Sequence, residues 1–215
     1  MTGFKRFLTE SPHLKGGEYT PGSNADGDSF ISDSSLQRKY EEIGNTTRDN
    51  ETFYIYRIVK GGDKIVRVVT PGKNMFDQDS NLIVTTIHFK YHPSSHKLPK
   101  DIDREKVYQV NGVYTKNKYR DIGLTSFAYL CLAKSGYTVI SDTVQYEDGK
   151  ELWKSLAKKS GLLFKIRILK GGDYMKDDSG KIIEYEAENP PDESLWSTGG
   201  SGAPKTDITF MIYGI

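Results

Sequence analysis

A run of basic residues leads directly into a predicted helix in the middle of the chain. Residues 113–125 read VYTKNKYRDIGLT, so a β-rich run ends, a turn with Lys116, Lys118 and Arg120 follows, and an apolar helical stripe begins after Gly123. The first backbone N–H groups of a helix have no partner within the helix, and the helix dipole adds partial positive charge there. Gly123 has no side chain to block close approach. This junction therefore favours a bound phosphate.

The turn resembles the central motif of the GNAT superfamily of N-acetyltransferases. In that motif a strand is followed by Arg or Gln, two residues, Gly, one residue, and a small residue that opens a helix. Arg120, Gly123 and Thr125 stand at these places, and Tyr119 fills the aromatic position often found before the Arg. Thr115 departs from the usual valine at the strand end, and Thr125 from the usual Gly or Ala. The alternative is a basic strand–helix turn with a capping glycine.

The resemblance implies a cofactor and the residues that hold it. Acetyl-CoA is expected to place its pyrophosphate on the turn and its pantetheine beside the strand that ends at Thr115. An amine then attacks the thioester directly, while backbone N–H groups near residues 114–116 polarise the thioester carbonyl. The residues predicted to bind the cofactor are Thr115, Lys118, Arg120, Asp121, Ile122, Gly123, Leu124 and Thr125.

The residues that would assist the chemistry match the family less closely. The strand before the turn offers Tyr108, Gln109 and Asn111 in place of the glutamate often used as a base. The tyrosine that commonly protonates the leaving thiolate aligns with Trp153, which has no acidic hydroxyl. The usual asparagine upstream aligns with Tyr146, so Tyr146 is the predicted proton donor.

Two further residues follow a predicted strand near this centre. Ser141 and Asp142 are expected to orient the acceptor, the alternative being ordinary strand-end residues. The sequence thus predicts an N-acetyltransferase that takes an amine-bearing small molecule or protein as its acceptor. The rival prediction is a catalytically degenerate GNAT-fold binding or structural module, such as a phage protein that acts on a host factor.

The elements that must position the turn follow from apolar periodicity. A helix capped by Asp33 or Ser34 is expected to carry Leu36, Tyr40 and Ile43 on one face. Helices are also predicted after residue 123 and around residues 152–156. The predicted strands cover residues 52–59, 64–69, 81–89, 107–115, 137–142, 162–169 and 208–213.

This order of elements predicts the fold class and the domain organisation. Antiparallel strands come first, then strand–helix–strand–helix–strand, then a final strand, which indicates an α/β (α+β) fold. We expect a GNAT-like mixed, mostly antiparallel central sheet flanked by helices. Residues 1–33 are rich in Gly, Ser, Pro and Asp and are expected to form a flexible tail, and residues 34–215 the acyl-CoA-binding domain.

Composition excludes several classes of protein and site. The chain of 215 residues has a net charge of +1, so no global field draws it to nucleic acid or to an anionic membrane. Its single cysteine, Cys131, excludes an internal disulfide and a cysteine-based zinc site. No apolar run reaches the roughly 18 residues of a membrane span. A protein of the cytoplasm with no membrane partner is expected.

Three histidines and the N-terminal residues carry further signals. His88, His92 and His96 recur every four residues but lie on a predicted strand that runs into a proline, so no metal site is expected. Phe4, Phe7 and the Leu-Thr-Glu that follows resemble capsid-targeting leaders of phage head proteins. The segments at 141–145 and 149–153 resemble phage-encoded acetyltransferases, which suggests a bacteriophage origin, with virion packaging as an alternative to the host cytoplasm.

Overall fold

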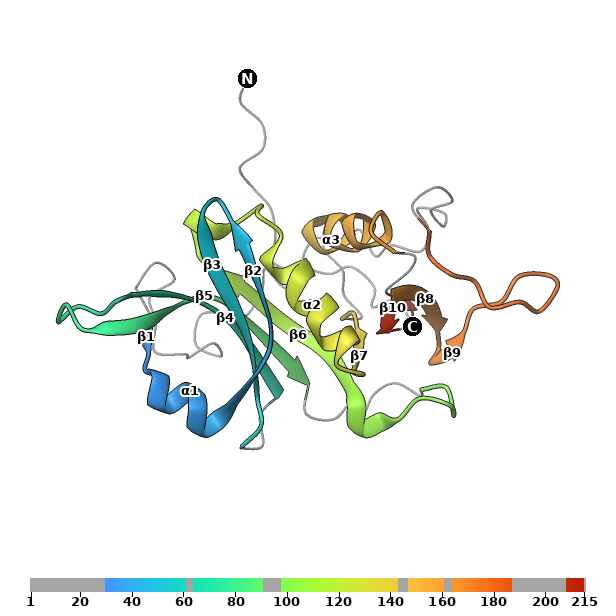
Figure 1. Cartoon of the computed structure of the whole chain (residues 1–215). Helices are drawn as coiled ribbons and strands as arrows, with labels where there is room; N and C mark the ends of the chain where they lie inside the picture. The colour runs from blue at the N-terminus through green and yellow to red at the C-terminus, as the bar shows by residue number, and fades with distance from the viewer. Residues whose placement is uncertain are drawn as a thin grey trace, which may run out of the picture.

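The strands of the computed structural model form one sheet. The structure describes residues 30–60, 64–90, 98–142, 147–160, 164–186 and 208–214. The sheet has ten strands in the order β2-β3-β4-β5-β6-β7-β10-β8-β9, with β1 paired to β5 (Figure 1). The strands are β1 (Phe30–Ile31), β2 (Tyr40–Arg48), β3 (Glu51–Ile58), β4 (Lys64–Lys73), β5 (Asp79–Lys90), β6 (Val107–Thr115), β7 (Thr138–Ile140), β8 (Phe164–Lys170), β9 (Asp173–Tyr174) and β10 (Ile208–Gly214).

Three α-helices and two short 3-10 turns accompany the sheet in the described ranges. The helices are α1 (Asp33–Lys39), α2 (Leu124–Lys134) and α3 (Glu147–Ala157), and the turns are η1 (Arg104–Lys106) and η2 (Asn117–Tyr119). Among the described strands, β6 and β7 form a parallel pair and the other pairs are antiparallel. The predicted mixed, mostly antiparallel sheet is confirmed.

The main hydrophobic core lies between one face of the sheet and the helices α2 and α3. Successive side chains of a strand point to opposite faces. The core takes one residue in two from several strands, among them Ile55, Ile87 and Phe210. Helix α3 contributes Trp153, which is completely buried. The Trp153 ring stacks on that of Phe210 with 5.7 Å between the centroids. Helix α2 adds Tyr129, whose ring is 6.2 Å from that of Trp153.

The opposite face of the sheet carries two smaller clusters. Leu36 of α1 packs there with Ile31 and Val69. Further along the sheet, Leu98 packs among residues of β6, β7, β8 and β10. Helices therefore cover both faces, as the sequence predicts. No helix in the described ranges is long and apolar enough to cross a membrane.

The helix predicted to carry Leu36, Tyr40 and Ile43 is wrong in its second half. Helix α1 ends at Lys39, and Tyr40 and Ile43 lie in β2. Strand β2 pairs with β3 from Tyr40 opposite Ile58 to the far end of the strand, except at Ile43, where the register shifts. Each ladder hydrogen bond satisfies a backbone group, and this pairing outweighs the helical spacing of three apolar residues.

The start of the folded region also differs from the prediction. Residues 1–29 lie outside the described residues, but Phe30 and Ile31, placed in the predicted tail, pair with β5. Ser32 caps α1, because its Oγ accepts a hydrogen bond from the N–H of Ser35 at 3.3 Å. The predicted caps, Asp33 and Ser34, are the first residues of the helix itself.

Candidate cofactor site

The turn between β6 and α2 is fastened to the sheet at its start. The buried hydroxyls of Thr85 and Thr115 are hydrogen bonded at 3.1 Å. One residue later, the N–H of Lys116 donates to the carbonyl of Val84 at 2.9 Å. Tyr119 of η2 is buried, so the turn is held at two points. The residues between Tyr119 and α2 are therefore presented from a fixed base.

Arg120 follows η2 within this turn, four residues before α2 begins. Its Nε donates to the carbonyl of Thr115 at 3.2 Å, which folds the side chain back toward the end of β6. Its two terminal nitrogens have no hydrogen-bond partner among the described residues. The side chain is half-buried. Arg120 therefore presents two charged donor groups from a fixed position, a geometry suited to phosphate oxygens.

The N-terminus of α2 begins beside Arg120 without a side-chain cap. Gly123 is the N-cap, with φ of 78°, and no side chain in the described part of the chain accepts a hydrogen bond there. The first backbone bond of the helix runs from the N–H of Phe127 to the carbonyl of Gly123 at 3.0 Å. The three preceding N–H groups thus have no partner among the described residues. A Cβ added to Gly123 would meet nothing within 4 Å, so the space outside is open.

The other residues predicted to bind the cofactor contribute less by their side chains. The ammonium group of Lys118 is ion-paired to Glu51 of β3 at 3.0 Å. The side chains of Leu124 and Thr125 are buried, so the backbone N–H groups are what these two residues can offer. Asp121 is exposed, Ile122 and Gly123 are half-exposed, and Thr115 is buried.

Beside the turn, β6 and β7 pair only at one end. Their parallel ladder joins Val107, Tyr108 and Gln109 to residues 138–140, and β6 then continues over residues 110–115. That continuation is about 20 Å long at the usual rise of a strand. A register shift opposite His88 and Phe89 places a bulge in β6 here. The two strands therefore form a fork that opens toward Arg120.

Ser141 fastens the chain after β7 to β10. Its N–H donates to the carbonyl of Phe210 at 2.9 Å. Its Oγ accepts from the N–H of Phe210 at 3.0 Å and donates to the carbonyl of Asp142 at 3.0 Å. Ser141 as a whole residue is only 1% exposed. These hydrogen bonds hold the chain after β7 against β10, so Ser141 has a structural role at the fork.

Asp142 lies at the same fork and is ion-paired. Its Oδ1 is 2.8 Å from the Nζ of Lys90 in β5. Tyr146, the predicted proton donor, lies outside the described residues. Trp153, which aligns with the family tyrosine, is buried in the core rather than placed at the fork. Ser141 and Asp142 therefore both lie at the fork, but the side chain of each is bonded to another part of the protein.

Two polar residues meet at the fork: Gln109, which the sequence offers in place of the usual base, and Lys90, which the sequence analysis did not single out. Lys90 holds Asp142, and Gln109 lies directly opposite Lys90 on β6. Gln109 is completely buried, and neither polar atom of its side chain has a hydrogen-bond partner in the described structure. In the sequence, the signal for this site is a glutamine among apolar residues of a strand. Its neighbours on the adjacent strands come from distant segments, so the sequence does not reveal them.

The structure describes only one of the three histidines of the series, so the expectation that they form no metal site stays a prediction. His88 lies in β5, and His92 and His96 are outside the described residues. The described ranges contain no group of three or more metal-ligating side chains.

Comparisons with models of protein families, with curated proteins and with solved structures found no match.

Proposed function

We propose that this chain binds acetyl-CoA at the turn between β6 and α2 and transfers the acetyl group to an amine, as a GNAT-type N-acetyltransferase. The observation that carries the proposal is that Arg120 stands three residues before Gly123, where α2 begins with no side-chain cap among the described residues. A pyrophosphate bound there would meet two donor groups of one guanidinium and the open N–H groups of a helix.

The fork supports the same ligand. Strand β6 extends past its last pair with β7 for about 20 Å, beside the end of the turn. An elongated ligand with amide groups can lie along the edge of a strand and exchange backbone hydrogen bonds with it. Pantetheine has this chemistry. The strand–helix–strand order around the turn also agrees with the GNAT resemblance.

In the proposed reaction the amine nitrogen attacks the thioester carbonyl carbon and the C–S bond breaks. The thiolate takes up a proton, and the new amide nitrogen loses one. An amine of ordinary pKa is almost wholly protonated at neutral pH, so a base or a water relay assists. Tyr146 is the proposed donor to the thiolate, and Asp142, once free of Lys90, the residue that orients the acceptor.

A second candidate function is a binding module that keeps the cofactor site without the chemistry. The observation that favours it is the state of the fork, where Ser141 is bonded to β10 and Asp142 to Lys90. Trp153 lies in the core and offers no acidic hydroxyl. Such a module would suit a phage protein that engages a host factor.

Calorimetric titration with acetyl-CoA tests the cofactor site, with CoA and ATP as controls. We expect micromolar affinity, about 8 kcal/mol, for acetyl-CoA and CoA and weaker binding of ATP. Absence of binding to the folded protein would contradict the proposal. Release of CoA thiol that depends on an added amine then separates the enzyme from the module, since only the enzyme turns over.

A further inference from the structure

Two large apolar side chains stand side by side at the end of a projecting hairpin. The β4–β5 hairpin extends away from the rest of the sheet, in teal and green at the left of Figure 1. Met75 and Phe76 occupy its turn and are 84% and 74% exposed. Single exposed apolar residues are ordinary. An adjacent pair at the tip of a hairpin is a concentrated apolar surface that costs free energy in water.

The turn that carries this pair is internally braced. The side-chain oxygen of Asn74 accepts from the N–H groups of Phe76 at 2.9 Å and Gln78 at 3.1 Å. The N–H of Asn74 donates to the carbonyl of Gln78 at 3.0 Å. Lys73 and Asp77 are ion-paired across the turn at 2.9 Å. A tip ordered in advance loses little conformational freedom when it binds.

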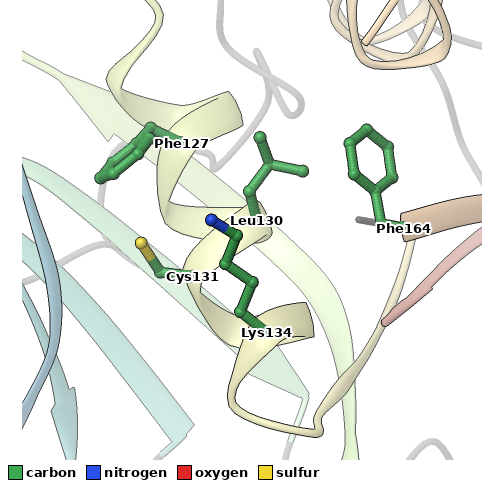
Figure 2. Close-up of a pocket in the computed structure, with 5 residues that line it drawn as sticks. All are labelled: Phe127, Leu130, Cys131, Lys134 and Phe164. Carbon is green, nitrogen blue, oxygen red and sulfur yellow. The ribbon is translucent and has the colours of Figure 1, made fainter. Parts of the chain in front are cut away.

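The same chain carries an apolar pocket beside α2. Phe127, Leu130, Cys131 and Lys134 of the helix line it together with Phe164 of β8 (Figure 2). Its volume is about 50 Å³. A cavity of about 150 Å³ accommodates benzene, so this pocket can take the end of a methionine side chain but not a phenyl ring. Met75 fits it, with Phe76 on the rim.

The charges around the tip and the pocket are opposite. Asp77 and Asp79 flank the tip, and one of them is already neutralised by Lys73. The pocket is bordered by the exposed Lys134 and by Arg48, whose guanidinium carbon lies 6.0 Å from the centroid of the Phe127 ring. Complementary charge steers two surfaces together and fixes their register.

We propose that the hairpin tip of one copy docks into the α2 pocket of a second copy. Met75 enters the pocket, Phe76 packs against Phe127, and Asp79 faces Lys134. Two copies related by a twofold axis exchange tips and make the contact twice. The buried area is small, so the association is weak, concentration-dependent and sensitive to salt.

Sedimentation velocity of the full chain over a concentration series, at low and high salt, tests this contact. We expect the average mass to rise above the monomer mass of 24.3 kDa with concentration. Met75→Ser with Phe76→Ser should raise the dissociation constant about tenfold or more, because the variant loses the side chains that make the contact. Both side chains are exposed in the monomer, so the substitutions should leave folding intact. Val59→Ser, at an exposed site away from the tip, is the control and should change nothing.

A charge reversal identifies the partner surface. Lys134→Glu and Asp79→Lys should each weaken the association, and the two together should restore most of it. Asp79 is preferred to Asp77, whose φ of 59° disfavours lysine. A protein that stays monomeric throughout, a tip variant that associates like the wild type, or a double variant weaker than either single change would each overturn the proposal.

Discussion

Lys90 and Asp142 form an ion pair of 2.8 Å that spans the strand lying between them. Lys90 belongs to β5 and Asp142 follows β7, and β6 separates these strands. Lys90 faces Gln109 across the β5–β6 ladder, and directly opposite residues share a face of the sheet. The ion pair therefore crosses β6 beside the buried amide of Gln109. It ties the chain that follows β7 to β5, across the closed end of the fork.

This relationship predicts a stability cost for Asp142→Asn. The side chains of Lys90 and Asp142 are 28% and 18% exposed, between the surface and buried classes of ion pair. We expect a loss of about 1–2 kcal/mol in the free energy of unfolding, measured with urea. A double-mutant cycle with Lys90→Met isolates the pair. A coupling energy indistinguishable from zero would show that the ion pair does not hold the fork.

Gly123→Ala separates the cost of backbone strain from the loss of ligand. Gly123 has φ of 78° and open space around it, so the substitution should cost about 1 kcal/mol of stability through the backbone alone. We also expect it to weaken acetyl-CoA binding, because the new conformation of the turn disturbs the N–H groups of α2. Unfolding curves and calorimetry measure the two effects.

Gly136→Ala is the matched control for that change. Gly136 follows the C-terminal end of α2, has φ of 80°, and a Cβ there also meets nothing within 4 Å. We expect the same loss of stability and an unchanged affinity for acetyl-CoA. Equal loss of affinity in both variants would mean that general destabilisation, and not the phosphate turn, explains the result.

Gly44 and Cys131 should be strongly coupled. A Cβ on Gly44 of β2 would lie 2.6 Å from the Sγ of Cys131 on α2, closer than atoms can approach. Gly44→Ala is therefore expected to cost about 1–3 kcal/mol of stability by overpacking. Cys131→Ala removes the obstructing sulfur and should recover much of that loss in the double variant. Additive losses in urea unfolding would contradict this packing.

The thiol of Cys131 should be unreactive in the folded protein. Burial raises its pKa to about 11. At pH 8 about one thiol in a thousand is then ionised, so we expect slow reaction with a thiol reagent until the chain unfolds. Because the raised pKa favours the neutral form, its contribution to stability is present below the unfolded pKa near 9 and is lost as pH rises through about 11. Rapid labelling at pH 8 without unfolding would be the opposite result.

Periodicity predicted most of the sheet because apolar side chains alternate along the buried strands. Strand β6 has the predicted bounds, and α2 begins directly after Gly123 as expected. Strand β2 was missed because it is an edge strand in which no residue is fully buried, and its pairing with β3 decides its conformation. Sequence spacing alone favoured a helix through Tyr40 and Ile43.

The candidate site was predictable only where its parts are neighbours in the sequence. Arg120 and Gly123 lie three residues apart, so the turn could be recognised from local spacing. The hydroxyl of Ser141 meets Phe210, 69 residues further along the chain. Lys90 reaches Asp142 across 52 residues. No local pattern encodes such contacts, because the folding of the sheet creates them.

The most direct test of the central claim compares acetyl-CoA binding by Arg120→Ala and Lys118→Ala in calorimetric titrations. Arg120 offers two donor groups that have no partner among the described residues, whereas the ammonium of Lys118 is held by Glu51. Hydrogen bonds to charged groups contribute about 1.5–3 kcal/mol, so we predict that Arg120→Ala weakens binding by about tenfold or more. Lys118→Ala should change the affinity by less than about threefold, in line with an exposed ion pair. Unchanged affinity in Arg120→Ala would contradict the assignment of the turn as the cofactor site.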